Sequence, residues 1–279
     1  MGGDRIGNGD EASPAPAGAG PRLPPRVPIG RLLEPTPEAE ERAGELRSLL
    51  ARGGVLAVPT ESSYGLAVDP RSVRGVEAVY RIKARDAGKP LPVVAADLEQ
   101  VTGLGIDPDL PILARLAPLW PAALSLVLPL EGGSGEGEPP GETSVPAAAG
   151  GGTLAVRVPA HGGLRRLLAA LGTPLTATSA NVSGEPPVLD PARAAELLAG
   201  QDAAVIDDGL LPGGPPSTLV VAREGMKSPR AGVANTAGVA NTGGVANTAE
   251  EASLEALGIE ILRPGRVSAE RIREALTGA

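Results

Sequence analysis

The side chains that could do chemistry in this sequence gather in a few short polar segments. The first, Pro59–Gly65, reads Pro-Thr-Glu-Ser-Ser-Tyr-Gly and follows directly on the apolar run Val55–Val58. Polar groups at the carboxyl end of a strand lie where α/β proteins bind their ligands. An ordinary polar turn could have the same composition, so the residues alone leave both interpretations open.

Two further segments could bind phosphate groups. Lys83, Arg85 and Lys89 place three cations within seven residues at the end of a predicted helix, and we expect Lys83 and Arg85 to be exposed. Such a cluster can hold a polyphosphate or merely complement the helix dipole. After the predicted strand Leu175–Thr178, the segment Ser179–Gly184 reads Ser-Ala-Asn-Val-Ser-Gly. Small polar residues in a turn can present donors to an anion or simply cap the next helix.

Two arginines lie inside or at the end of apolar strands. Arg157 belongs to the run Leu154–Val158, and Arg263 is followed by Pro-Gly. A guanidinium in such a place needs an anionic partner because an unpaired buried charge is costly, and either a protein carboxylate or a phosphate could serve. His161 has no obvious partner beside it, so we interpret it as a surface or packing residue.

Composition excludes several classes of chemistry. With no Cys and a single His, the chain cannot use a thiolate or Cys-ligated zinc, and a Ser-His-Asp triad is strongly disfavoured. A net charge of −8 and 1% aromatic residues predict weak or no direct nucleic-acid binding. No Gly-Lys-Ser/Thr phosphate loop occurs. We expect a cytoplasmic protein with no membrane segment, since no secretory signal or long unbroken apolar run is found.

Alternating strand and helix patterns must position these residues. Short runs rich in Val, Leu and Ile predict strands at 55–58, 91–95, 124–128, 153–158, 175–178, 203–206, 218–221 and 259–262. A helix is predicted to follow the cap residue Thr36, with Pro37 in its first position. The alternation favours an α/β fold whose ligand groups lie at strand ends.

Domain boundaries follow from composition. Residues 1–34 are rich in Gly, Pro and Ala and are predicted to be a disordered leader to one folded domain over 35–279. Low-complexity inserts are predicted at 131–152 and 228–252. The second insert repeats a six-residue Gly-Val-Ala-Asn-Thr-Ala/Gly motif three times within 232–249, which we interpret as a flexible insertion.

Taken in order along the chain, these segments resemble the YrdC family. The motifs that carry the resemblance are Pro59-Thr60-Glu61, Tyr64-Gly65, Lys83-Ala84-Arg85, Pro90-Leu91, Trp120-Pro121, Val156-Arg157-Val158-Pro159, Ser179-Ala180-Asn181, Ser183-Gly184, Ser217-Thr218 and Leu262-Arg263-Pro264-Gly265. A lone Lys-x-Arg has little value, whereas the whole series in register is specific. One departure follows Trp120, where the family has Pro-Gly-Pro-x-Thr and this chain has Pro-Ala-Ala-Leu-Ser, ending at Ser125.

The resemblance implies a twisted mixed sheet with helices, in a single YrdC-like domain around a deep basic cleft. It implies an L-threonylcarbamoyladenylate synthase, a nucleotidyltransferase that combines L-threonine, bicarbonate and ATP, with Mg²⁺, and releases pyrophosphate. This reaction is the first step towards threonylcarbamoyladenosine in tRNA. The expected partner is therefore a downstream tRNA-modifying transferase complex, and the metal ligands are unknown.

By residue-level match to the family motifs, Lys83, Arg85, Ser179 and Asn181 would be catalytic. They would bind ATP together with Arg157 and Arg263, and a threonine site would be lined by Thr60, Tyr64 and Lys89. Two alternatives stay open, namely a non-catalytic module that binds double-stranded RNA and a carbamoyltransferase-type YrdC-like domain. The net charge of −8 speaks against the first, and the lack of Cys-rich zinc modules speaks against the second.

Overall fold

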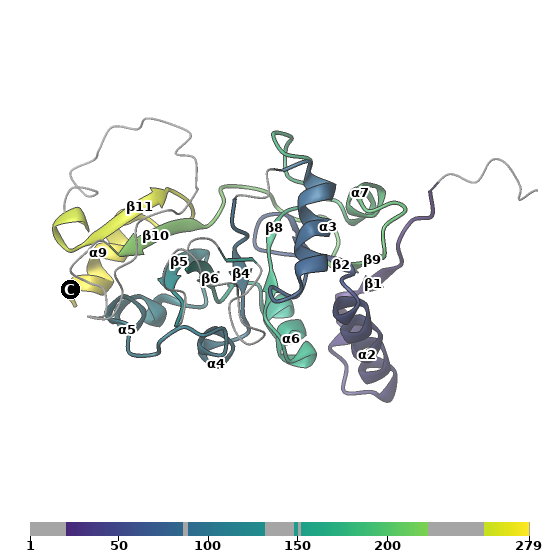
Figure 1. The fold of residues 1–279 in the computed structure, drawn as a ribbon, viewed down its shortest axis with the longest axis horizontal. Coiled ribbons are helices and arrows are strands. Elements are labelled where there is room, and N and C mark those ends of the chain that lie inside the picture. Colours follow the sequence, from purple (N-terminus) through teal and green to yellow (C-terminus); the bar gives the residue numbers. More distant parts are fainter. Residues whose placement is uncertain (1–20, 86–88, 132–147, 150–151, 223–253, 279) are drawn as a thin grey trace, which may run out of the picture.

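The structure, a computed structural model, describes residues 21–85, 89–131, 148–149, 152–222 and 254–278. Strands and helices alternate along much of this chain, which confirms the α/β class (Figure 1). The prediction of one mixed sheet is corrected, because the strands form two mixed sheets. The chain passes from one sheet to the other at Ala177, which separates β7 (Leu175–Thr176) from β8 (Thr178–Ser179). The single strand predicted over 175–178 is thereby split.

The first sheet has the strand order β1-β9-β2-β3-β8. Its strands are β8, β1 (Arg26–Pro28), β9 (Ala203–Asp207), β2 (Val55–Pro59) and β3 (Tyr64–Ala67). Strands β2 and β3 are buried along their whole length and pair antiparallel, while β2 pairs parallel with β9 on its other side. The sequence analysis missed β3 because Tyr-Gly-Leu-Ala contains few residues that favour strands.

The second sheet has the strand order β11-β10-β5-β6-β4-β7. Its strands are β7, β11 (Ile259–Arg263), β10 (Thr218–Ala222), β5 (Leu124–Pro129), β6 (Thr153–Arg157) and β4 (Val93–Val94). Strand β5 pairs parallel with β10 and antiparallel with β6. Figure 1 shows β6, β5, β10 and β11 in succession toward the end of the molecule that carries the C-terminus.

Apart from the short α1, the helices of the described residues begin with a side chain that accepts an N–H of the first turn or with a proline, which has no N–H to satisfy. In α2 (Pro37–Ala51) the Thr36 side chain accepts the Ala39 N–H, as the sequence predicted, and Ser268 caps α9 (Ala269–Thr277) in the same way. Further helices are α1 (Ile29–Leu32), α3 (Val73–Lys83), α4 (Leu98–Thr102), α5 (Pro111–Leu116), α6 (Gly162–Leu171), α7 (Pro191–Leu197) and the 3-10 helix Ala117–Leu119. Among the helices of the described residues, none is long and apolar enough to cross a membrane.

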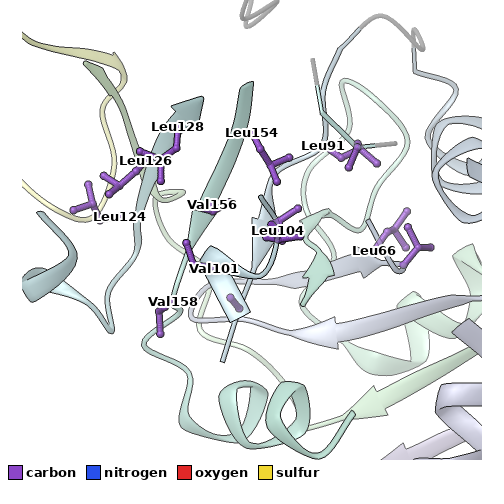
Figure 2. Close-up of a cluster of buried hydrophobic side chains, with 14 of the residues drawn as sticks. Leu66, Leu91, Val101, Leu104, Leu124, Leu126, Leu128, Leu154, Val156 and Val158 are labelled. Atoms are coloured by element: carbon purple, nitrogen blue, oxygen red, sulfur yellow. The ribbon is translucent and has the colours of Figure 1, made fainter. Parts of the chain in front are cut away.

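The hydrophobic core gathers leucines and valines from the strands and the helices that cover them. Figure 2 shows the part of this core that involves β5, β6 and α4. The alternate residues Leu124, Leu126 and Leu128 of β5 belong to the main core, whereas Val127 packs with Leu219 in a separate small cluster. Because side chains alternate along a strand, Ser125 lies on the face of Val127 and not on the face of the main core.

The prediction of a disordered leader over residues 1–34 is wrong for its last part. Residues 1–20 lie outside the described residues, but β1 and α1 follow soon after them. Strand β1 pairs parallel with β9, and Arg26 makes a 2.6 Å ion pair with Asp207. Apolar side chains in β1 and α1 are buried in the core, a pattern that the Gly- and Pro-rich composition concealed.

Most of the two predicted inserts lies outside the described residues. The 228–252 insert falls there entirely, together with its 232–249 repeat. Within the 131–152 insert, however, Ala148 is fully buried. Its N–H donates to the Pro70 carbonyl at 3.1 Å, and its carbonyl accepts the Leu91 N–H at 3.0 Å. This end of the predicted insert therefore belongs to the folded domain.

Candidate active site

The carboxyl end of α3 places Lys83 inside the protein. The helix begins after the cap residue Ser72 and buries Val76 and Val79 along one face. Lys83 follows Val79 by four residues and so lies on the same face. It is only 3% exposed, which makes the expectation of an exposed cation wrong. The helix ends at Ala84, a residue in the left-handed region with φ of 45°.

The Lys83 ammonium joins α3 to the turn after β8. Its Nζ donates to the Ser179 carbonyl at 2.5 Å, to the Asn181 carbonyl at 3.1 Å and to Asn181 Oδ1 at 2.8 Å. An ammonium has three N–H donors, so protein oxygens use them all. Ser179 Oγ donates to the same Asn181 Oδ1 at 2.7 Å. Three predicted site residues thus form one hydrogen-bonded group, which we call the Lys83 unit.

Arg85 lies beside the Lys83 unit and is held far more loosely. Its guanidinium donates to Thr178 Oγ1 at 3.5 Å and to the Pro90 carbonyl at 3.3 Å. In the described part of the chain no carboxylate pairs with it. Burial lowers the pKa of Arg85, and burial together with the positive charge of Arg85 lowers the pKa of Lys83 to about 8. An anionic ligand bound nearby would raise the pKa of both side chains again.

The lowered pKa of Lys83 predicts a pH dependence of stability. Its ordinary pKa of 10.5 applies to the unfolded chain, and the folded value is about 8. Between these values the unfolded state binds more protons, so the contribution of Lys83 to the free energy of unfolding rises with pH. This contribution is lost as the pH falls through about 8.

Urea unfolding of the wild type and of Lys83→Met from about pH 7 to about pH 10 checks this dependence. The difference in free energy of unfolding between the two proteins should shift in favour of the wild type as the pH rises. A difference that stays constant over the range would contradict the assignment of the lowered pKa to Lys83.

A second group of cations lies on the other sheet. Arg157 ends β6, and its Nη1 donates to Glu61 Oε2 at 3.0 Å, with the two side chains 11% and 10% exposed. The other oxygen of Glu61 accepts the Ala160 N–H at 2.6 Å. Burial alone would raise the pKa of Glu61, but the charge of Arg157 and backbone N–H groups outweigh burial and lower it. The partner of Arg157 that the sequence left open is therefore a protein carboxylate, which engages one of the five guanidinium N–H donors.

Arg263, at the end of β11, contacts a serine. Its Nε and Nη2 donate to the Ser217 carbonyl at 3.2 and 3.0 Å, and Nη2 also donates to Ser217 Oγ at 3.0 Å. The residue as a whole is exposed, yet protein atoms crowd its guanidinium. This crowding and, second, the positive charge of Arg157 lower the pKa of Arg263. An anion bound near both guanidinium groups would relieve their repulsion.

Of the three residues predicted to line a threonine site, Thr60 and Tyr64 are buried and Lys89 is exposed. Thr60 is 6% exposed, and its Oγ1 donates to a backbone carbonyl in its own turn at 2.7 Å. Tyr64 is fully buried, and its hydroxyl donates to the Gly209 carbonyl at 2.8 Å and accepts the Asp208 N–H at 3.1 Å. Burial raises the pKa of Tyr64 to about 12. Both hydroxyls are engaged within the protein, whereas Lys89 is exposed.

The sequence analysis named three further residues of this region without giving them a role in the site. Glu61 pairs with Arg157, and Ser125 contacts Ser217, which in turn contacts Arg263. The available signal for Glu61 was a carboxylate within the first polar segment. For Ser125 it was a single hydroxyl inside an otherwise apolar strand, at the position where the chain departs from the family pattern.

His161 has a local structural role. Its Nδ1 accepts the Leu164 N–H at 3.0 Å and so caps α6, while its Nε2 lies 3.0 Å from Asp208 Oδ2. Because Nδ1 accepts, the ring proton belongs on Nε2 and faces that carboxylate. The interpretation of His161 as a packing residue is confirmed, with a partner that the sequence did not reveal.

The described residues thus form two cationic groups, one around Lys83 and Arg85 at the end of α3 and the other around Arg157 and Arg263 at the ends of β6 and β11. Groups of this kind bind phosphate and carboxylate oxygens. Within the described ranges no cluster of three or more His, Cys, Asp or Glu could hold a metal ion. The deep basic cleft that would connect the two groups stays a prediction.

Comparison with known proteins identifies the family. The model of the Sua5/YciO/YrdC family, described as "Telomere recombination", matches residues 48–232. This range contains both halves of the Lys83 unit as well as Glu61 and Arg157. The chain therefore belongs to the Sua5/YciO/YrdC family.

The match to this chain covers different shares of two named relatives. The threonylcarbamoyl-AMP synthase of Thiobacillus denitrificans is 36% identical over 191 residues, which cover 65% of this chain and 93% of the relative. The threonylcarbamoyl-AMP synthase of Bacillus subtilis is 32% identical over 173 residues, which cover 61% of this chain and 47% of the relative. The match thus spans nearly all of the first relative and about half of the second.

Solved structures share the fold. A double variant of Sua5 from P. abyssi is 26% identical with a TM-score of 0.61, over 84% of this chain and 60% of that one. Sua5 from P. abyssi complexed with L-threonine is 30% identical with a TM-score of 0.55, over 65% of this chain and 51% of that one. YciO from E. coli, 20% identical with a TM-score of 0.55 over 71% of this chain and 88% of that one, shows the fold alone.

Proposed function

We propose that this chain is an L-threonylcarbamoyladenylate synthase, which forms threonylcarbamoyl-AMP and pyrophosphate from L-threonine, bicarbonate and ATP. The observation that carries the proposal is the Lys83 unit with the loosely held Arg85 beside it. A half-buried guanidinium with no carboxylate partner among the described residues suits a phosphate chain. Relatives named threonylcarbamoyl-AMP synthase and a fold neighbour solved with L-threonine support it.

The reaction requires no covalent intermediate with the enzyme. The threonine amine adds to CO2 derived from bicarbonate and loses a proton, which gives a carbamate. A carbamate oxygen then attacks the α-phosphorus of ATP, and the new P–O bond forms as the bond to pyrophosphate breaks. Two anions must approach each other, so the main requirement is for positioned cations that lower their repulsion and stabilise the charge on pyrophosphate.

In this proposal the cations have different tasks, and their contacts within the protein support the division. Arg85 contacts the phosphates of ATP directly, and Arg157 and Arg263 bind anionic oxygens from the other sheet. Lys83 has its three donors occupied by protein oxygens, so it holds the turn at Ser179 in place instead of contacting a phosphate. Its role is that of a positioning residue, which differs from the catalytic role that the family match suggested.

ATP is proposed to react as its Mg²⁺ complex. Mg²⁺ keeps several waters and is usually held by substrate phosphates together with one or two carboxylates. The described residues offer no larger cluster of possible ligands. The phosphates would therefore supply most of the ligands other than water, and the protein ligands stay unassigned.

Threonine is the proposed amino acid, with Thr60, Tyr64 and Lys89 in its vicinity. Because the hydroxyls of Thr60 and Tyr64 are engaged within the protein, their part would be to shape the wall of the site. The product would pass to a downstream tRNA-modifying transferase complex in the cytoplasm. With a net charge of −8, the chain itself would bind nucleic acid weakly or not at all.

The test is pyrophosphate release from Mg²⁺-ATP by the purified protein, with and without threonine and bicarbonate. We expect release only when both are present. Valine should support it at least about 100-fold less efficiently, because it leaves the partners of the threonine hydroxyl unpaired. Release that is independent of threonine would contradict the proposal. A salt-sensitive shift of double-stranded RNA without turnover would favour the RNA-binding alternative instead.

A further inference from the structure

Glu61 is a largely buried carboxylate for which the proposed reaction has no chemical step. It belongs to the turn between β2 and β3 of the first sheet, yet its side chain contacts the second sheet. Its Oε2 accepts from Arg157 Nη1 at 3.0 Å, and its Oε1 accepts from the Ala160 N–H at 2.6 Å. A side chain of the first sheet therefore holds the end of β6 at two points.

The turn that carries Glu61 is itself held in place. Thr60 Oγ1 donates to the Ser63 carbonyl at 2.7 Å across the turn, and the Ser62 carbonyl accepts the Gly213 N–H at 2.8 Å. Strand β2, which leads into the turn, is buried along its whole length. The backbone at Glu61 thus has little freedom, so the carboxylate can fix the position of the groups that it contacts.

Strand β3 connects Glu61 to the Lys83 unit. It follows the turn and pairs with β8, where Gly65 of β3 is in register with Ser179. The Ser179 carbonyl in turn accepts a hydrogen bond from the Lys83 ammonium. The two cationic groups are therefore linked through β3 and its turn, and Glu61 makes the contact with Arg157 on the second sheet.

The carboxylate of Glu61 could act as a general base or as a support for Arg157. A general base works best with a pKa near the pH of the reaction. Although burial favours the neutral acid, the charge of Arg157 and backbone N–H groups lower the pKa of Glu61 below its ordinary value. Both of its oxygens also accept hydrogen bonds within the protein. Such a carboxylate is a poor base, whereas its contact with a planar guanidinium orients the other N–H donors of that group.

We propose that Glu61 is a positioning residue, which holds the Arg157 guanidinium at a fixed place relative to the Lys83 unit so that anionic groups bound on the two sheets meet in a reactive geometry. The inference rests on the proposed function, in which the carbamate and ATP must approach in line. Small displacements of reacting groups cost large factors in rate. Glu61 thus contributes to turnover without touching either substrate.

Glu61→Gln in the full-length protein tests this role, because a glutamine oxygen can accept from Arg157 or from Ala160 but its amide cannot accept from both. We expect kcat for pyrophosphate release to fall about 100-fold. Calorimetry with inorganic pyrophosphate should give a Kd within about threefold of the wild type or lower, since the substitution removes a negative charge beside Arg157. A lower kcat with unimpaired binding indicates misplaced groups and not a lost binding contact.

Asp208→Ala is the matched control. Asp208 follows β9 of the first sheet and lies 3.0 Å from His161 in the segment after β6, so it also joins the two sheets, but its partner is an imidazole instead of a guanidinium. Its kcat should stay within about twofold of the wild type. Because Glu61 acts through Arg157, Glu61→Gln should lower kcat no further once Arg157 is replaced by glutamine.

NMR of the arginine side chains measures the positioning without any turnover. In the wild type the two Nη groups of Arg157, assigned by comparison with Arg157→Gln, should rotate slowly and give separate signals. These signals should merge in Glu61→Gln and stay separate in Asp208→Ala. If they do so but the wild type releases no pyrophosphate, the proposed function fails while the role of Glu61 in holding Arg157 stands.

Four results would overturn the inference. The first is merged Arg157 signals in the wild type, and the second is an unchanged kcat in Glu61→Gln together with a lower melting temperature, as a purely structural ion pair predicts. The third is an equal loss of kcat in Asp208→Ala, and the fourth is additive losses in the double variant of Glu61 and Arg157.

Discussion

Replacing Arg85 by alanine is expected to lower kcat/KM for pyrophosphate release about 100-fold or more, with a melting temperature within about 2 °C of the wild type. Its guanidinium makes two long contacts among the described residues, to Thr178 Oγ1 at 3.5 Å and to the Pro90 carbonyl at 3.3 Å. Hydrogen bonds of this length contribute little to folding. A cation that stabilises developing charge on the phosphates is worth about 3 kcal/mol in the transition state.

Arg81 provides the matched control for this substitution. It lies in the last turn of the same helix and is exposed. Arg81→Ala should therefore change neither turnover nor melting temperature. Steady-state kinetics and calorimetry on the two variants check the prediction. Normal turnover in Arg85→Ala would remove Arg85 from the site, and a loss of several degrees would instead show a role in folding.

Lys83→Met is expected to impair both folding and catalysis, with a free energy of unfolding about 2 kcal/mol lower and turnover at least about 100-fold lower. The substitution leaves three oxygens of Ser179 and Asn181 without their ammonium donor. Each buried acceptor left unpaired costs about 1–3 kcal/mol, and removal of a partly desolvated charge offsets part of this loss. Without the ammonium, the turn that faces the proposed phosphate site is no longer held.

Urea unfolding and pyrophosphate release measured side by side check this second prediction. The variant that combines Lys83→Met with Asn181→Ala should lose less than the sum of the two single losses, because both substitutions break the same unit. Full activity with reduced stability would show that the turn keeps its shape without Lys83. Full stability would show that the three hydrogen bonds contribute nothing to folding.

The contrast between Lys83 and Arg85 shows how much of the candidate site could be predicted from the sequence. The Lys-x-Arg motif identified Lys83 and Arg85 together, and it treated them as equivalent exposed cations at the end of a helix. Their positions relative to α3 make them different. Lys83 continues the buried face of Val79, whereas Arg85 follows the left-handed Ala84 beyond the helix. Two residues along the chain, with the end of the helix between them, thus separate a residue that holds the site from one that is available to a ligand.

What the sequence by itself determined is the local structure and the order of the motifs. Thr36 and Ser268 cap their helices as their residue types predict, and the apolar runs become strands. These features depend on neighbours within a few residues, whose preferences can be read from the chain. The same order of motifs was enough to indicate the family.

Only the tertiary structure decided which side chains meet. The Lys83 ammonium and the Ser179 carbonyl are 96 residues apart in the chain, as are Arg157 and Glu61, and Arg263 lies 46 residues from Ser217. Such contacts depend on strand register and on the face to which each side chain points, and a shift of one residue would reverse every face. The partner of Arg157 and the burial of Lys83 follow from that register, which no local pattern in the sequence specifies.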